Sequence, residues 1–279
     1  MKPCLSLVTL CETETPKALE AAARAGFTHV EFWWPRLKTE LQSGGLEAIQ
    51  TAVHEKEIET LGIAGLGLEL AGSEELWRES LARAADAFAA IAPLHLPCVT
   101  FTPGLVHETP HEGHYALALE RLGVLDQLAA SFQLQLALEV RADSRWLTSL
   151  DTAAALVSQL NSDRVGLCLD LFHFYLGPGK FEDLNKIVVG LLKSVQLSDL
   201  IGTPRELARD TDRIFPGEGD FDPASLLKRL QKYHYAGPVT VEVPNPNLWT
   251  IPADRVSDMA YQSLGRLWPQ PTADHSTTQ

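Results

Sequence analysis

The chain has 279 residues and only four cysteines, which stand singly in apolar segments without a C-x-x-C pair (Cys4, Cys11, Cys98 and Cys168). This pattern is typical of reduced, buried thiols, and it excludes a disulfide framework or a zinc knuckle. No run of 18 apolar residues occurs, and the apolar start of the chain is too short for a signal peptide. We therefore expect a cytoplasmic protein.

Basic residues are also scarce, because 23 Lys and Arg stand against 36 Asp and Glu, giving a net charge of −13. An acidic surface repels phosphate backbones and anionic lipid headgroups, so we expect neither nucleic acid nor a membrane as partner. A small molecule remains the expected partner, and self-association into a homo-oligomer is left open. The polar segment 269–279, PQPTADHSTTQ, predicts a disordered C-terminal tail.

A glycine-rich phosphate loop is missing after the first apolar run, since SLVTLCETETP (6–16) contains no glycine. This absence disfavours a doubly wound dinucleotide-binding sheet. Strands buried on both faces read as near-continuous apolar runs, and such runs occupy 4–10, 28–34, 61–68, 97–103, 134–140, 165–171, 194–199 and 238–243. Helical patterns between them include 73–92, 111–131, 149–161 and 181–192. Repeated strand–helix units of this number predict an α/β protein, a single-domain (β/α)8 TIM barrel over residues 1–268.

Polar side chains interrupt the last four apolar runs, each time near the C-terminal end, where barrels of this kind carry their chemistry. The residues are Glu139, Asp170, Gln196 and Glu242, with Asp199 just beyond Gln196. Three carboxylates in one small volume would raise each other's pKa unless a cation lay between them. Their oxygen donors predict one divalent metal ion, Mn²⁺ or Mg²⁺ first and Co²⁺ or Zn²⁺ as alternatives. Separate strand-capping or ion-pairing roles are the competing interpretation.

Four further side chains are candidates for this site. His173 follows Asp170 by three residues, so we expect it to face the site as a substrate contact or general acid/base, with a structural histidine as the alternative. Trp33 and Trp34 end the second run, and pocket wall and core remain equal alternatives for them. For Glu31, an interior position and a pairing with a basic neighbour both stay open.

The segments LALEV, VGLCLDLFHFYLG, SVQLSDL, RIFPGEGDFD and GPVTVEVPNP resemble the xylose isomerase-like TIM-barrel superfamily of sugar phosphate isomerases and epimerases. The likeness covers nearly the whole chain and is strongest over 134–246. It implies metal ligands at Glu139, Asp170, Gln196 and Glu242, an active-site histidine at His173, and substrate contacts at Trp34, Arg213 and Glu218.

Gln196 departs from many sugar epimerases, which have histidine at this metal position. Glutamine there resembles hydroxypyruvate isomerase-like members and 3-dehydroshikimate dehydratases. The dehydratases also tend to carry an arginine six residues after the first metal glutamate, which corresponds here to Arg145. Arginine binds a substrate carboxylate through two hydrogen bonds, although a surface ion pair is the alternative for Arg145.

The resemblance implies proton abstraction next to a carbonyl of a small sugar or hydroxy-keto acid, with Glu139 or Glu242 as the base and a metal-stabilised enediolate as the intermediate. Return of the proton to the neighbouring carbon makes an isomerase, and return to the opposite face makes an epimerase. Loss of a β-hydroxyl makes a dehydratase, a lyase, with His173 as acid or base. We expect an isomerase or epimerase, with a 3-dehydroshikimate dehydratase-like enzyme as the alternative. A DNA-repair endonuclease of the same superfamily needs a basic surface, and a barrel that only binds sugar has no need of this ligand set.

Overall fold

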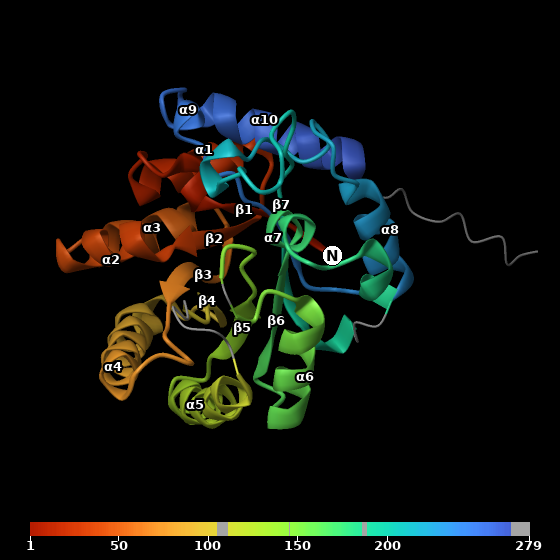
Figure 1. The fold of residues 1–279 in the computed structure, drawn as a ribbon. Helices are drawn as coiled ribbons and strands as arrows, with labels where there is room; N and C mark the ends of the chain where they lie inside the picture. Colours follow the sequence, from red (N-terminus) through yellow and green to blue (C-terminus); the bar gives the residue numbers. More distant parts are fainter. Residues whose placement is uncertain (105–110, 145, 186–188, 269–279) are drawn as a thin grey trace, which may run out of the picture.

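A computed structural model describes residues 1–104, 111–144, 146–185 and 189–268. Its parallel strands close into one barrel in chain order (Figure 1). They are β1 (Lys2–Ser6), β2 (His29–Trp33), β3 (Glu59–Gly67), β4 (Cys98–Thr102), β5 (Gln135–Glu139), β6 (Val165–Asp170), β7 (Leu192–Leu197) and β8 (Pro238–Val241). Because β8 also pairs with β1, the sheet has no free edge. The predicted (β/α)8 barrel is confirmed.

Helices form a ring outside the strands (Figure 1). The α-helices are α1 (Thr15–Ala25), α2 (Trp34–Gln42), α3 (Leu46–Glu55), α4 (Glu74–Ile91), α5 (Glu112–Ser131), α6 (Leu150–Leu160), α7 (Leu171–Leu176), α8 (Pro223–Lys232), α9 (Pro246–Trp249) and α10 (Ala253–Leu267). Short 3₁₀ turns cover Leu7–Leu10, Ala92–Leu94, Phe181–Asn185, Val189–Leu191 and Asp210–Asp212. No helix in the described ranges is long and apolar enough to cross a bilayer.

The strands are apolar throughout because they are covered on both faces. Along β6 every residue from Val165 to Asp170 is buried, since its side chains point alternately into the barrel and toward the helices. Each buried side chain of valine or leucine size contributes roughly 1.5–3 kcal/mol to folding. A buried carboxylate at the end of such a strand therefore needs a partner that offsets its desolvation.

Two sequence predictions differ from the observed elements. The first apolar run, 4–10, leaves the sheet after Ser6 and continues as the 3₁₀ turn Leu7–Leu10. The helix expected over 181–192 is absent from the described part of that segment, which holds two 3₁₀ turns and the first residue of β7. Valine and glycine at 189 and 190 have low helix propensity, which explains the second difference. The predicted tail 269–279 lies outside the described residues, and its boundary at 268 stays a prediction.

The connection between β7 and α8 runs across the C-terminal rim of the barrel and is organised by Asp199. This buried carboxylate accepts hydrogen bonds of 2.9 Å from the backbone amides of Leu200, Gly217 and Phe221. Gly217 has φ of +83°, a conformation that side chains disfavour. Asp199 thus shapes the loop that carries Arg213, rather than joining the carboxylates nearby.

Candidate active site

The strand ends bring four predicted residues to one rim of the barrel. Glu139 and Asp170 are the last residues of β5 and β6, Glu242 directly follows β8, and Gln196 lies one residue before the end of β7. Asp170 and Gln196 are partners in the register of β6 and β7. Each of the four side chains belongs to a residue that exposes 6% or less of its surface. The structure therefore places three carboxylates and an amide in one buried group.

Arg213 supplies positive charge to this group. Its Nη1 donates to Asp170 Oδ2 at 2.7 Å and to Glu242 Oε2 at 3.4 Å. Its Nη2 and Nε donate to Asp210 Oδ1 at 2.6 and 3.1 Å, and the guanidinium lies 4.4 Å from the centroid of the Phe172 ring. Burial alone would lower the pKa of Arg213, but these carboxylates raise it, so the side chain stays charged.

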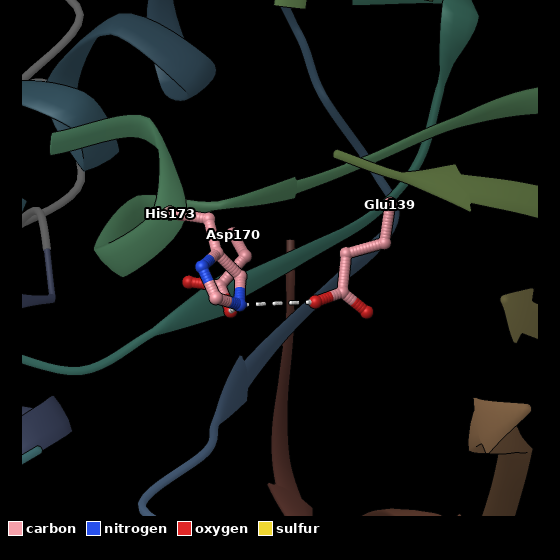
Figure 2. A group of neighbouring side chains, drawn as sticks. All are labelled: Glu139, Asp170 and His173. Atoms are coloured by element: carbon pink, nitrogen blue, oxygen red, sulfur yellow. Dashed lines mark ion pairs between the residues drawn. The ribbon is translucent and has the colours of Figure 1, made fainter. Parts of the chain in front are cut away.

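His173, on α7, points back toward the strand ends. Figure 2 shows its ring and the Glu139 carboxylate facing each other, with Nε2 at 3.7 Å from Glu139 Oε1. Burial lowers the pKa of His173 to about 4, so the ring is neutral at pH 7. Because a guanidinium can only donate, Arg213 Nη2 at 3.2 Å makes Nε2 the acceptor and places the ring proton on Nδ1. The lone pair of Nε2 therefore accepts from Arg213, on the side of the ring that faces the strand-end carboxylates.

The carboxylates have more negative charge than Arg213 can balance. Burial, and then the charge of Asp170, raises the pKa of Glu139 to about 8. Burial likewise raises the pKa of Glu242 well above its usual range, against the opposing effect of Arg213. The Glu139 carboxyl therefore holds a proton at neutral pH unless a second cation joins the group.

The chemistry of the donor set fits a divalent cation. Ligand atoms of Glu139, Asp170 and His173 lie within 4.8 Å of one another, and all three residues are buried (Figure 2). Among the described residues, His173 Nδ1 is a buried nitrogen without a hydrogen-bond partner, so only Nε2 of this ring has polar contacts. Oxygen atoms with one imidazole nitrogen suit Mn²⁺, Mg²⁺ or Zn²⁺.

Gln196 is oriented by neighbours on both sides. Its Nε2 donates to Glu31 Oε2 at 3.0 Å and to Glu242 Oε1 at 3.1 Å, while its Oε1 accepts from Cys168 Sγ at 3.0 Å. The amide nitrogen faces Glu31 and Glu242, because a carboxyl oxygen acts as the acceptor in both contacts. In this orientation the oxygen, the atom that could bind a cation, faces Cys168. The role of Gln196 as a metal ligand stays a prediction that requires the amide to turn over.

A cavity of about 270 Å³ lies beside this group. Charged residues line one part of it (Glu139, Arg141, Asp210, Arg213 and Glu242), and an apolar wall includes Val8, Trp33, Pro244 and Trp249. Trp33 packs on Gly65, whose φ of +87° and close approach exclude a side chain, because a Cβ there would overlap the indole ring. The cavity has the size of a small metabolite.

Other predicted residues lie apart from this cavity. Trp34 begins α2 and packs in the core between helix and strand, so that Trp33 forms the cavity wall in its place. Glu218 pairs with Arg266 of α10 at 3.0 Å on an exposed part of the surface. Its position gives no support to a substrate contact. Arg145 lies outside the described residues.

Three functional candidates were missed or left undecided by the sequence. Arg141, two residues after Glu139, contacts Asp210 at 2.6 Å, and both line the cavity. Glu31 is buried on β2 within the barrel, and burial raises its pKa to about 7. The signal for Glu31 was a carboxylate inside an apolar strand, whereas Arg141 and Asp210 stand in loops without a recognisable pattern.

Comparison with known proteins agrees with the fold. A family model described as xylose isomerase-like TIM barrel matches residues 19–264. A crystal structure of the IolI protein with a bound zinc atom matches with a TM-score of 0.89 at 21% identity, over 96% of this chain and 98% of that one.

Two curated relatives have names that denote enzymes. The inosose isomerase of Halalkalibacterium halodurans is 23% identical over 258 residues, which cover 91% of this chain and 92% of that protein. The 3-dehydroshikimate dehydratase of Pseudomonas aeruginosa is 30% identical over 143 residues, which cover 50% of this chain and 22% of that longer protein. The expected relationship to isomerases is confirmed at this level. The chain belongs to the xylose isomerase-like TIM-barrel family.

Proposed function

We propose that this protein is a divalent-cation-dependent isomerase or epimerase of a small hydroxy-carbonyl compound. The observation that carries the proposal is the buried group of Glu139, Asp170 and Glu242, with neutral His173, beside a cavity of about 270 Å³. The inosose isomerases among the relatives, and the zinc in the IolI structure, support the same reading.

Glu139, Asp170 and Glu242 would hold the cation, with His173 Nε2 or the turned amide of Gln196 as a further ligand. A bound Mn²⁺, Mg²⁺ or Zn²⁺ would polarise a carbonyl and stabilise the negative charge that develops when a neighbouring proton leaves. Glu139 or Glu242 accepts that proton, since both carboxylates border the cavity. Arg213 donates to substrate oxygens, and where Gln196 is the further ligand, the neighbouring Nε2 of His173 accepts a hydroxyl proton.

Elimination of water from a carboxylated substrate is the second candidate. The match to a 3-dehydroshikimate dehydratase and the presence of Arg141 on the cavity wall favour it. The same base would remove the proton, and His173 would assist departure of the β-hydroxyl.

The test is incubation with Mn²⁺ in D₂O and proton NMR on inosose, several ketoses, hydroxypyruvate and 3-dehydroshikimate. Deuterium next to a carbonyl, with accumulation of an isomer, is the expected result. A conjugated product from the acid would establish the dehydratase instead. Glu139→Gln and chelator-treated protein are the controls, and exchange that survives in both would refute the proposed site.

A further inference from the structure

Two arginines on different strand-end loops bind the same carboxylate at the cavity. Arg141 Nη2 donates to Asp210 Oδ2 at 2.6 Å, while Arg213 Nη2 and Nε donate to Asp210 Oδ1 at 2.6 and 3.1 Å. Arg141 follows β5, and Arg213 lies in the connection after β7. The two arginines therefore reach Asp210 from different parts of the barrel rim. All three residues line the reaction cavity.

Asp210 is more exposed than the Arg213 side chain that it binds. It lies on a single 3₁₀ turn, Asp210–Asp212, and its side chain is 30% exposed, against 2% for Arg213. A second cavity of about 320 Å³ lies on its other side and is also lined by Arg141 and Asp210. Rotation of Asp210 toward that space would leave both arginines facing the reaction cavity. Arg141 would keep a second partner, because its Nε and Nη2 also bind Asp143 at 2.9 and 3.0 Å.

We propose that Arg141 and Arg213 form the binding site for a carboxylate of the substrate, and that Asp210 holds this site until substrate displaces it. The inference rests on the proposed function and narrows its substrate to hydroxy-keto acids. A substrate carboxylate has the same planar pair of acceptors as Asp210, and arginine forks recognise that geometry through paired hydrogen bonds. A neutral ketose offers no group that replaces the charge of Asp210 between the two guanidiniums.

The test compares two ligands that differ in this one group, hydroxypyruvate and dihydroxyacetone. Titration calorimetry with Mn²⁺ present measures their affinities without requiring turnover. We expect hydroxypyruvate to bind the wild type at least about tenfold more tightly, as charge-assisted hydrogen bonds allow. Arg141→Gln should remove most of that preference and leave dihydroxyacetone binding unchanged.

Arg205→Gln is the matched control, because Arg205 lines the second cavity and stacks on Tyr175 at 5.3 Å without contacting Asp210 in the described contacts. This variant deletes one positive charge nearby. If it lost as much of the preference for hydroxypyruvate as Arg141→Gln, the preference would depend only on the net charge around the cavity, and the proposal would be overturned. Equal wild-type affinities for the two ligands would overturn it as well.

Asp210→Asn provides a second, independent measurement. Removal of the competing charge should strengthen hydroxypyruvate binding severalfold, whereas a loop-supporting role would weaken the binding of both ligands. Deuterium exchange separates this inference from the proposed function. Deuterium exchange on neutral ketoses, without tighter binding of hydroxypyruvate, would refute the carboxylate-binding site alone. Tighter binding of hydroxypyruvate without deuterium exchange on any compound would refute the proposed reaction alone.

Discussion

Strands β1–β4 and strands β5–β8 reach the same rim of the barrel but end in different side chains. The first half ends in Ser6, Trp33, Gly67 and Thr102, while the second half and the residue after it supply Glu139, Asp170, Gln196 and Glu242. Both halves consist of parallel strands of one closed barrel, and the strand ends of the second half are the more deeply buried. The contrast shows that the fold provides equivalent positions, and that the choice of residue at each strand end decides which half forms the wall and which half carries charge.

Glu31 is the exception that joins the two halves. It lies on β2 in the first half, two residues before the strand ends, and its carboxylate accepts from Gln196 of β7. Thr100 of β4 donates to its other oxygen at 3.4 Å. Glu31, in the first half, therefore holds the amide of Gln196 in the second half by a hydrogen bond.

The largest expected effect concerns two buried arginines, one from each half. Arg213→Met leaves Asp170 and Glu242 without their counter-charge, so we expect the cation-free protein to lose about 3–5 kcal/mol of unfolding free energy. Mn²⁺ should restore most of this loss, because it neutralises the same carboxylates. Denaturant titrations with and without Mn²⁺ measure both effects.

Arg121→Met is the control for that experiment. Arg121 is also buried, but its Nη1 donates to the backbone carbonyls of Leu70 and Gly72 at 3.2 and 2.7 Å. We expect a similar destabilisation with no rescue by Mn²⁺. Equal rescue of both variants would show that the cation does not act at Arg213's carboxylates.

Asp170→Asn should weaken cation binding about a hundredfold to a thousandfold. The binding free energy of a structural zinc site is about 10–16 kcal/mol, and this range corresponds to one quarter of it, the share of one ligand among four. The asparagine still accepts the hydrogen bond from the amide of Phe172, so this contact at the start of α7 is retained. Calorimetric titration with Mn²⁺ provides the measurement. Glu40→Gln is the control in the first half, where Glu40 pairs with Arg36. Wild-type affinity in Asp170→Asn would contradict the assignment.

Cation binding should depend on pH because Glu139 must lose its proton. Burial raises the pKa of Glu139 to about 8 from its ordinary 4.5. The folded, cation-free protein therefore binds more protons than the unfolded chain between these values, and its stability falls as pH rises across them. Affinity for Mn²⁺ should rise up to about tenfold per pH unit below 8 and then level off.

Calorimetry at pH 7 in two buffers of different ionisation enthalpy counts the protons released on Mn²⁺ binding. We expect release in the wild type and less of it in Glu139→Gln. Identical heats in the two buffers would show that the carboxyl is already ionised.

The smallest effect is expected at Glu31, where the two halves meet. Glu31→Leu removes a buried contact from the surroundings of the metal ligands, and such outer contacts typically contribute at least about tenfold to metal affinity. Glu31→Gln retains an acceptor oxygen and should lose less. Competition with a chelating dye measures the Mn²⁺ affinity of both variants. Equal affinities in Glu31→Leu and wild type would show that the contact between Glu31 and Gln196 has no effect on cation binding.

The barrel was predictable because both of its signals are local. Apolar runs of strand length alternate with helical patterns, and a carboxylate such as Asp170 inside an apolar run needs a partner wherever the chain places it. The direction in which each side chain points at a strand end was harder to predict. Trp33 and Trp34 are identical side chains in consecutive positions, and only the end of β2 decides that the first one lines the cavity and the second one packs in the core.

Relations between distant loops could not be read from the sequence at all. The pairing of Arg141 with Asp210 joins two loops 69 residues apart, and the orientation of Gln196 depends on Glu31, 165 residues away. The ion pair of Glu218 with Arg266 on α10 likewise joins residues 48 positions apart, and the role of Glu218 as a substrate contact stays a prediction. Such contacts arise only when the barrel closes.

The contact between Trp33 and the bare backbone of Gly65 makes the volume of the reaction cavity adjustable at a position that bears no reactive group. A methyl group added at residue 65 would displace the indole and change the cavity, while Glu139, Asp170 and Glu242 stay where β5, β6 and β8 hold them. In the proposed enzyme, substrate size and reaction chemistry would therefore depend on different sides of the barrel. One can change during divergence, or in the laboratory, without disturbing the other.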